Sequence, residues 1–68
     1  MVTIFGKDSC PYTTAARDDY AKRGVAFEYV NVKKSEEGLA RMLAHSEGRR
    51  LVPVIVEGGR VTVGFGGT

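Results

Sequence analysis

VTIFGKDSCPYT, residues 2–13, is the segment from which the architecture of the chain can be worked out. Residues 2–5 form a short apolar, partly β-branched run that ends at the polar sequence GKDS, as expected for a buried strand that leads into a loop. Cys10 follows the loop, and Pro11 suits the first turn of a helix because its missing N–H would be unpaired there in any case. The segment therefore predicts a strand, a loop, a cysteine and a helix in immediate succession.

The patterning of the whole chain predicts six elements in the order β-α-β-α-β-β, at residues 2–5, 12–23, 25–32, 35–48, 51–56 and 60–63. Gly24 marks the end of the first helix, and Ser35 is suited to cap the second. Gly58-Gly59 is a pair able to adopt the positive φ values of a tight hairpin turn between the last two strands. A strand, a helix and a strand in succession normally form a right-handed parallel crossover, and a final hairpin adds an antiparallel edge. We expect one α/β domain over residues 1–68 with a four-stranded mixed sheet.

Composition and charge limit the class of protein. The 68 residues are 43% hydrophobic and 26% charged, which is typical of a globular domain rather than a disordered chain. The net charge of +2 is small, and basic residues are interleaved with acidic ones except at Lys33-Lys34 and Arg49-Arg50, so nucleic-acid binding is not indicated. No apolar run is long enough for a signal-peptide core or a membrane span, and we expect a cytoplasmic protein with no membrane partner.

Cys10 is the only cysteine, so any disulfide must join this chain to another molecule. Its sulfur should lie where unpaired backbone N–H groups and the dipole of the following helix favour the thiolate, which is the nucleophile in disulfide exchange. Lys7 adds positive charge nearby, and the hydroxyl of Thr13, one turn along the helix, is placed to donate a hydrogen bond to the sulfur. The alternative is a buried structural thiol. The polar loop before Cys10 and the proline after it favour the reactive interpretation.

Residues 7–13, KDSCPYT, resemble the Lys-x-x-Cys-Pro-Tyr-Cys site of glutaredoxins and differ from it at Thr13, which replaces the second cysteine. Residues 51–53, Leu-Val-Pro, fall where that family carries Thr-Val-Pro, and the glycine-rich end of the chain falls where it carries a Gly-Gly pair. The resemblance covers nearly the whole chain and implies the thioredoxin/glutaredoxin fold. The Cys-x-x-Thr site is also similar to that of short thioredoxin-fold proteins whose nucleophile is cysteine or selenocysteine.

The resemblance further implies which residues form the site. Pro53 would be cis and face the cysteine, and it would expose the backbone of Val52 for strand-like pairing with a peptide or with glutathione. Glutathione would be the co-substrate, and no cofactor would be bound permanently. The residues implied are Cys10, Thr13 and Pro53 for catalysis and Lys7, Tyr12, Arg49, Val52 and Thr68 for glutathione binding.

Three functions are compatible with a single nucleophilic cysteine. The first is a monothiol thiol–disulfide oxidoreductase, in which Cys10 attacks a glutathionylated protein or a small disulfide and a second glutathione releases it. The second is a peroxide reductase that passes through a sulfenic acid. The third is a carrier in which Cys10 and glutathione bridge an iron–sulfur cluster between two chains, although Pro11-Tyr12 is the redox-type form of the motif. The only histidine, His45, cannot assemble a four-ligand zinc site with one cysteine, so no metal site is predicted.

The end of the sequence suggests an interface. After residue 63 the chain has only GFGGT, whereas glutaredoxins continue into a third helix that covers one face of the sheet. With one helix on each side, part of an apolar sheet face should stay uncovered, and a contiguous apolar patch usually marks an interface. We therefore expect a symmetric homodimer, or a partner protein docked on this face.

Overall fold

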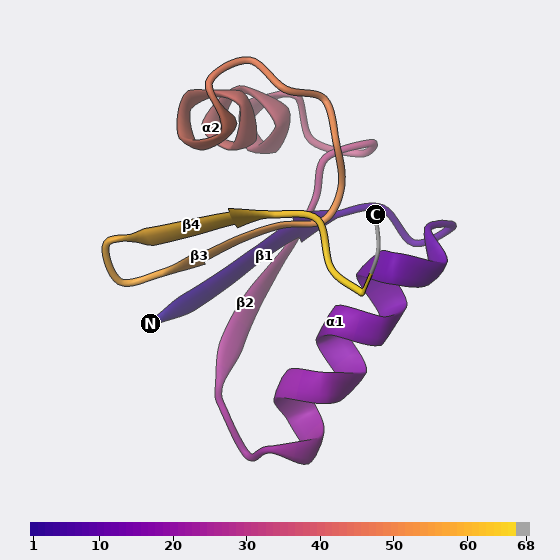
Figure 1. The fold of residues 1–68 in the computed structure, drawn as a ribbon. Helices are drawn as coiled ribbons and strands as arrows, with labels where there is room; N and C mark the ends of the chain where they lie inside the picture. The colour runs from indigo at the N-terminus through magenta and orange to yellow at the C-terminus, as the bar shows by residue number, and fades with distance from the viewer. Residues whose placement is uncertain (67–68) are drawn as a thin grey trace.

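The computed structural model describes residues 1–66 and has the predicted β-α-β-α-β-β order. The strands form a four-stranded mixed sheet in the order β2-β1-β3-β4, in which β1 is parallel to β2 and antiparallel to β3, and β3 is antiparallel to β4. The predicted thioredoxin-like fold class is thereby confirmed (Figure 1). The elements are β1 (Val2–Gly6), α1 (Pro11–Lys22), β2 (Phe27–Asn31), α2 (Glu36–Ser46), β3 (Val54–Glu57) and β4 (Arg60–Val63).

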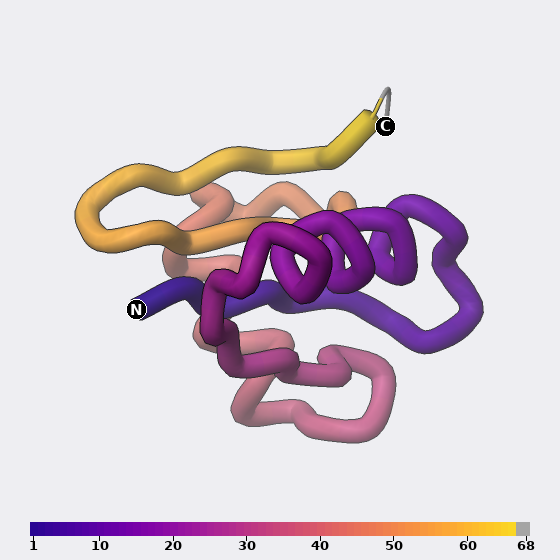
Figure 2. Tube along the Cα trace, turned by 90° about the horizontal axis from the view of Figure 1, so that it is seen from below, coloured from indigo at the N-terminus to yellow at the C-terminus, as the bar shows by residue number. Residues whose placement is uncertain are grey.

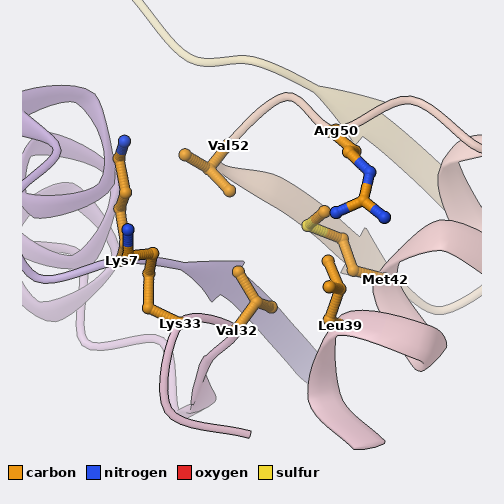
Figure 3. A pocket seen from close by; sticks show the side chains of 7 residues that line it. All are labelled: Lys7, Val32, Lys33, Leu39, Met42, Arg50 and Val52. Atoms are coloured by element: carbon orange, nitrogen blue, oxygen red, sulfur yellow. The ribbon is translucent and has the colours of Figure 1, made fainter. Parts of the chain in front are cut away.

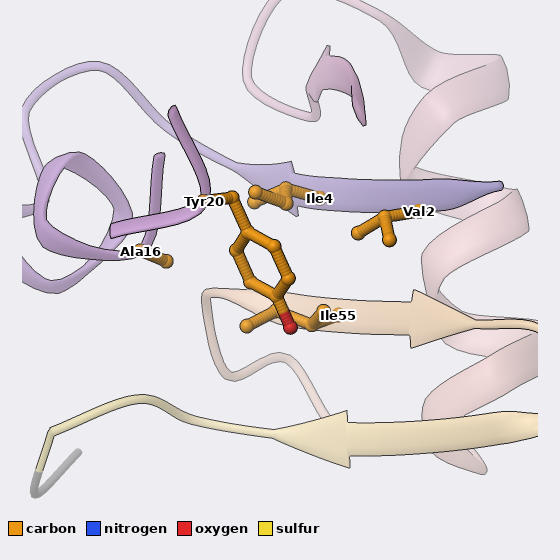
Figure 4. Close-up of a cluster of buried hydrophobic side chains, with 5 residues drawn as sticks. All are labelled: Val2, Ile4, Ala16, Tyr20 and Ile55. Carbon is orange, nitrogen blue, oxygen red and sulfur yellow. The ribbon is translucent and has the colours of Figure 1, made fainter. Parts of the chain in front are cut away.

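The two helices of the described chain lie on opposite faces of the sheet (Figure 1). Ile4 and Phe5, neighbours in the central strand β1, point to opposite faces and are both fully buried. On one face, α1 covers a cluster formed by Val2, Ile4, Ala16, Tyr20 and Ile55 (Figure 4). On the other face, Met42 of α2 packs against Phe5 and Val54. Neither of the helices found within residues 1–66 has the length and apolar character needed to cross a lipid bilayer.

Helix α1 begins and ends one residue earlier than the sequence predicts. Cys10 occupies the N-cap position with an extended backbone, and Pro11 is the first helical residue. At the other end Gly24 adopts a left-handed φ of 71°, and the N–H of Val25 donates to the carbonyl of Tyr20, which closes the last turn. Cys10 follows the carboxyl end of β1 in the chain. Because β1 and β2 are parallel, the carboxyl end of β2 lies at the same edge of the sheet.

Helix α2 also has its predicted cap, but it is shorter than the sequence suggested. The Ser35 Oγ accepts a hydrogen bond from the N–H of Gly38 at 2.9 Å. The helix ends at Ser46 rather than at Gly48, because Glu47 and Gly48 both adopt left-handed φ angles, of 58° and 86°. Two residues of the predicted helix therefore belong to the loop that leads toward β3.

Two of the strands begin later than predicted, and the register with β1 explains both differences. The strand expected over residues 25–32 begins at Phe27, because β1 offers its first partner there, at Val2. The strand expected over residues 51–56 begins at Val54, because the pairing of β1 with β3 ends at that residue. Residues 51–53 therefore form a loop at the same end of the sheet as Cys10. In the hairpin between β3 and β4, only Gly58 of the two glycines has a positive φ.

The sheet face that carries α1 continues past the helix over β3 and β4 (Figure 2). Ile55 is only 3% exposed on this face, and Phe65 packs against the cluster that contains it. The residue paired with Ile55 in β4 is the polar Thr62. The homodimer or docked partner expected on this face stays a prediction.

Candidate active site

Cys10 is held at the start of α1 by backbone hydrogen bonds on both sides. Its N–H donates to the carbonyl of Lys7 at 3.2 Å, and its carbonyl accepts from the N–H of Thr14 at 3.1 Å and from the Thr14 hydroxyl at 3.4 Å. Cys10 is 8% exposed, and its Sγ lies 3.9 Å from the carbonyl oxygen of Val52. The sulfur is thus fixed near the surface, between the N-terminus of α1 and the loop at residues 51–53.

The surroundings of Cys10 favour its ionised form. Burial raises the thiol pKa, but the backbone N–H and the hydroxyl of Thr13 and the backbone N–H of Tyr12 donate toward the sulfur, and Lys7 adds positive charge. Together these groups outweigh burial, so the pKa of Cys10 is lowered below that of an ordinary thiol. A larger fraction of Cys10 is therefore present as the nucleophilic thiolate near neutral pH than in a free cysteine.

Thr13 is fully buried between Cys10 and β1. The N–H of Lys7 approaches Thr13 Oγ1 at 3.5 Å, which leaves the hydroxyl proton available to the sulfur of Cys10. The absence of a side chain at Gly6 makes this position possible, since a Cβ there would lie 2.5 Å from Thr13 Oγ1. Thr13 is therefore a hydrogen-bond donor to the sulfur at the place where the Lys-x-x-Cys-Pro-Tyr-Cys motif has its second cysteine.

The loop at residues 51–53 forms the opposite wall of the site. The Val52–Pro53 peptide bond is cis, as the resemblance implies, and Pro53 is buried. The carbonyl of Val52 faces the Cys10 sulfur, whereas Leu51 is 51% exposed. Backbone and apolar side-chain surface are thus both present next to the thiol.

An open pocket of about 180 Å³ lies next to the residues that hold Cys10, although Cys10 itself does not line it (Figure 3). Its apolar lining is formed by Val32, Leu39, Met42 and Val52. Lys7 and Lys33 lie on one side of it and Arg50 lies on the other. Lys7 and Val52 also contact Cys10, so the pocket and the thiol share two wall residues. An apolar floor between cations on opposite sides is suited to a short peptide that carries more than one carboxylate.

The pocket brings together only some of the residues implied for glutathione binding. Lys7 and Val52 line it, whereas Tyr12 does not and is 42% exposed at the start of α1. Arg49 instead lines a second depression, of about 300 Å³, between the end of α2 and β4. Thr68 lies outside the described residues.

Sequence reasoning missed two of the cations, Lys33 and Arg50. Both belong to the basic pairs that interrupt the otherwise mixed charge pattern, and those pairs were the available signal. The pattern alone does not tell which member of each pair turns toward the site. In the structure Lys34 turns toward Asp8, with its Nζ 3.8 Å from Asp8 Oδ2, and Lys33 lines the pocket.

The described part of the chain contains no group of three or more His, Cys, Asp or Glu side chains able to hold a metal ion. His45 lies away from the pocket beside Cys10, in the depression that Arg49 lines. Its ring packs against Phe5, with the two ring centroids 5.9 Å apart.

The chain is similar to a known protein family and to several solved structures. The family model described as Glutaredoxin matches residues 2–62. A glutaredoxin from Archaeoglobus fulgidus is similar at 29% identity with a TM-score of 0.79, covering 96% of this chain and 75% of that one. NrdH-redoxin from Escherichia coli, described as a glutaredoxin-like protein with a thioredoxin-like activity profile, is similar at 30% identity with a TM-score of 0.79, covering 94% of this chain and 82% of that one. A thioredoxin-like protein at 24% identity, with a TM-score of 0.88 and coverage of 97% and 88%, shares the fold. None of the curated proteins matches the chain.

Proposed function

Because this chain belongs to the glutaredoxin family, we propose that it is a monothiol thiol–disulfide oxidoreductase that reduces mixed disulfides between proteins and glutathione. Family and fold support thiol–disulfide exchange in general. The observation that supports the glutathione-linked form is the pocket beside Cys10, in which Lys7, Lys33 and Arg50 surround an apolar floor.

The reaction needs one nucleophile and two exchange steps. The Cys10 thiolate attacks the glutathione sulfur of the mixed disulfide, so that a Cys10–glutathione disulfide forms and the protein leaves as its thiolate. The thiolate of a second glutathione then attacks the glutathione sulfur of this intermediate, which yields oxidised glutathione and returns the Cys10 thiolate. Thr13 has no sulfur with which to resolve the intermediate, and its hydroxyl instead stabilises the attacking and leaving forms of the Cys10 thiolate.

The pocket matches the chemistry of glutathione. This tripeptide is negatively charged overall, and it has a carboxylate at each end and amide groups between them. Cations on opposite sides of the pocket are suited to the two carboxylates, and the backbone of Val52, next to the thiol, is suited to pair with the central cysteine of the tripeptide. Binding in this orientation would direct the glutathione sulfur toward Cys10.

The similarity to NrdH-redoxin supports a second form of the same chemistry, in which the attacked disulfide contains no glutathione. Leu51, half exposed next to Val52, would then contact an apolar residue of a protein substrate. In this form the cations of the pocket would contribute little to the rate, and that difference makes the two forms separable.

Adjacent arginines provide a matched experiment. Arg50 lines the pocket beside Cys10 and Arg49 lines the other depression, so Arg50→Ala and Arg49→Ala remove equal charge from neighbouring positions. The rate of the first exchange step is measured on a peptide that carries glutathione in mixed disulfide, and on the same peptide that carries a neutral hydroxyethyl thiol instead. We expect Arg50→Ala to slow only the first substrate, by about fivefold, which corresponds to roughly 1 kcal/mol for one exposed charged contact. Equal rates of the two variants on both substrates would contradict the glutathione-linked form.

A further inference from the structure

A polar cluster outside the pocket connects the loop that carries Cys10 to three other segments. The hydroxyl of Tyr29, in β2, donates to Asp8 Oδ1 at 2.8 Å. Arg17, in α1, lies over the Tyr29 ring with its guanidinium carbon 3.9 Å from the ring centroid, and its Nη1 is 3.9 Å from Asp8 Oδ1. Lys34, which follows β2, also reaches Asp8. Asp8 therefore joins the Cys10 loop to β2, to α1 and to the segment after β2.

The hydrogen bond from Tyr29 is the contact of this cluster best able to hold the loop. The two ion pairs are long and exposed, with the Asp8 side chain 59% and the Lys34 side chain 78% exposed, so each contributes little. The bond that the Tyr29 hydroxyl donates to the same carboxylate is also exposed, but at 2.8 Å it is much shorter than the ion pairs, and such charge-assisted bonds are stronger than neutral ones. Burial and the bond to Asp8 raise the pKa of Tyr29 to about 12, so the hydroxyl keeps the proton that it donates.

We propose that Tyr29 is a positioning residue for Cys10: its hydroxyl holds Asp8, and through Asp8 it fixes the turn at residues 7–10 that seats the cysteine on the N-terminus of α1. The turn is tight, since the N–H of Cys10 donates to the carbonyl of Lys7, three residues earlier. Asp8 is the second residue of this turn, and only Ser9 separates it from Cys10. The inference rests on the proposed thiol chemistry and adds to it the device that keeps the sulfur in place.

Loss of the Tyr29 hydroxyl should raise the pKa of Cys10. When the turn is released, the N–H groups of Tyr12 and Thr13 are no longer aligned with the sulfur, which raises the pKa of Cys10. Lys7, the cation that lowers the pKa of Cys10, belongs to the same turn and is displaced with it.

The protein contains a matched control at the opposite end of the same helix. Tyr20 donates its hydroxyl to Glu57 Oε1 at 3.2 Å, and Arg23 lies over its ring with the guanidinium carbon 4.3 Å from the centroid. The arrangement has the same three components as the Tyr29 cluster, but it ties α1 to β3 and has no link to the Cys10 turn. Tyr20→Phe therefore reports the cost of losing a tyrosine–carboxylate bond without an effect on the thiol.

The experiment compares Tyr29→Phe and Tyr20→Phe by the pH dependence of Cys10 alkylation, which measures the thiol pKa without glutathione. We expect the pKa of Cys10 to rise by roughly 0.5 unit in Tyr29→Phe, or about threefold less thiolate at pH values below the pKa, and to stay unchanged in Tyr20→Phe. Exchange of the Cys10 amide proton, whose hydrogen bond closes the turn, should become faster only in Tyr29→Phe. A pKa shift and an exchange rate no larger in Tyr29→Phe than in Tyr20→Phe would overturn the inference.

A double-mutant cycle tests the route through Asp8. In an Asp8→Ala background the change of Tyr29 to phenylalanine should produce no further pKa shift, because the contact through which Tyr29 acts is already absent. The same shift in both backgrounds would exclude Asp8 as the link. An ordinary thiol pKa in the unmodified protein would instead count against the proposed function, while the amide-exchange comparison would still decide the role of Tyr29.

Discussion

Gly6→Ala is expected to damage the Cys10 site by steric overlap with Thr13. Gly6 is the last residue of β1 and is buried where α1 begins above the sheet. An added Cβ would lie 2.5 Å from Thr13 Oγ1 and would also overlap its Cγ2, which is far inside van der Waals contact. Thr13 is fully buried and β-branched, so it has neither free space nor an easy alternative rotamer. The substitution therefore forces a shift of α1 or of the Thr13 side chain.

The size of the effect follows from the closed packing. Forcing extra atoms into a well-packed site typically costs about 1–3 kcal/mol. In a domain of this size each kcal/mol lowers the melting temperature by roughly 4–8 °C, so we expect a decrease of at least about 4 °C. Displacement of Thr13 also removes its N–H and its hydroxyl from the sulfur, and the pKa of Cys10 should rise toward that of an ordinary thiol.

Thermal unfolding followed by circular dichroism measures the first effect, and Gly59→Ala is its control. A Cβ at Gly59 would meet no atom within 4 Å, so that variant should melt close to the unmodified protein. Thr13→Ala removes the two nearest atoms and leaves the Thr13 Cβ at 3.0 Å, so Gly6→Ala combined with Thr13→Ala should regain part of the lost stability without regaining the lowered thiol pKa. Equal melting temperatures of the Gly6→Ala and Gly59→Ala proteins would show that the added Cβ at Gly6 does not overlap with Thr13.

Three further outcomes are expected. Because the pKa of Cys10 in the folded protein lies below its unfolded value of about 8.5, the thiolate stabilises the fold above that value, and this contribution is lost as the pH falls through the folded pKa. The unmodified protein should therefore gain more unfolding free energy over Cys10→Ser at about pH 9 than at about pH 5. A difference between the two proteins that does not change with pH would argue against a lowered pKa. Ser35→Ala removes the acceptor of the Gly38 N–H and should lower the free energy of unfolding in urea by about 1 kcal/mol, whereas an unchanged value would show that the cap contributes nothing. The homodimer expected from the sequence predicts a melting temperature that rises with protein concentration, and a sedimenting monomer with a constant melting temperature would exclude it.

Most of the fold could be predicted from residues that mark the ends of helices. Pro11, Gly24 and Ser35 mark helix ends through their own backbone and capping chemistry, so the order of elements and the position of Cys10 at a strand–helix junction could be predicted without a structure. The first and last residues of the strands could not be predicted in this way, because a strand ends where the neighbouring strand has no further residues to pair with it. For this reason the sequence predicts a strand at residues 51–53, where the structure has a loop.

Features set by contacts distant in sequence were also beyond prediction. Gly38 looks like a defect inside α2, but a Cβ there would lie 2.5 Å from Val30 Cγ1, so the glycine allows the helix to approach β2 closely. The resemblance pointed to Arg49 for glutathione binding, whereas the structure places its neighbour Arg50 at the pocket beside Cys10. The direction of the chain after α2 decides between the two arginines, and only the packed structure supplies it.

If Cys10 is the residue that carries out glutathione-linked disulfide exchange, it must form a mixed disulfide with glutathione, which intact-mass measurement detects after the protein is mixed with oxidised glutathione. We expect one glutathione adduct per chain, located on Cys10, absent in Cys10→Ser and removed when reduced glutathione is added. Because the pKa of Cys10 is lowered, adduct formation should remain rapid at a pH where a free cysteine is mostly protonated. A chain that forms no adduct, or an adduct that reduced glutathione does not remove, would contradict the proposed reaction.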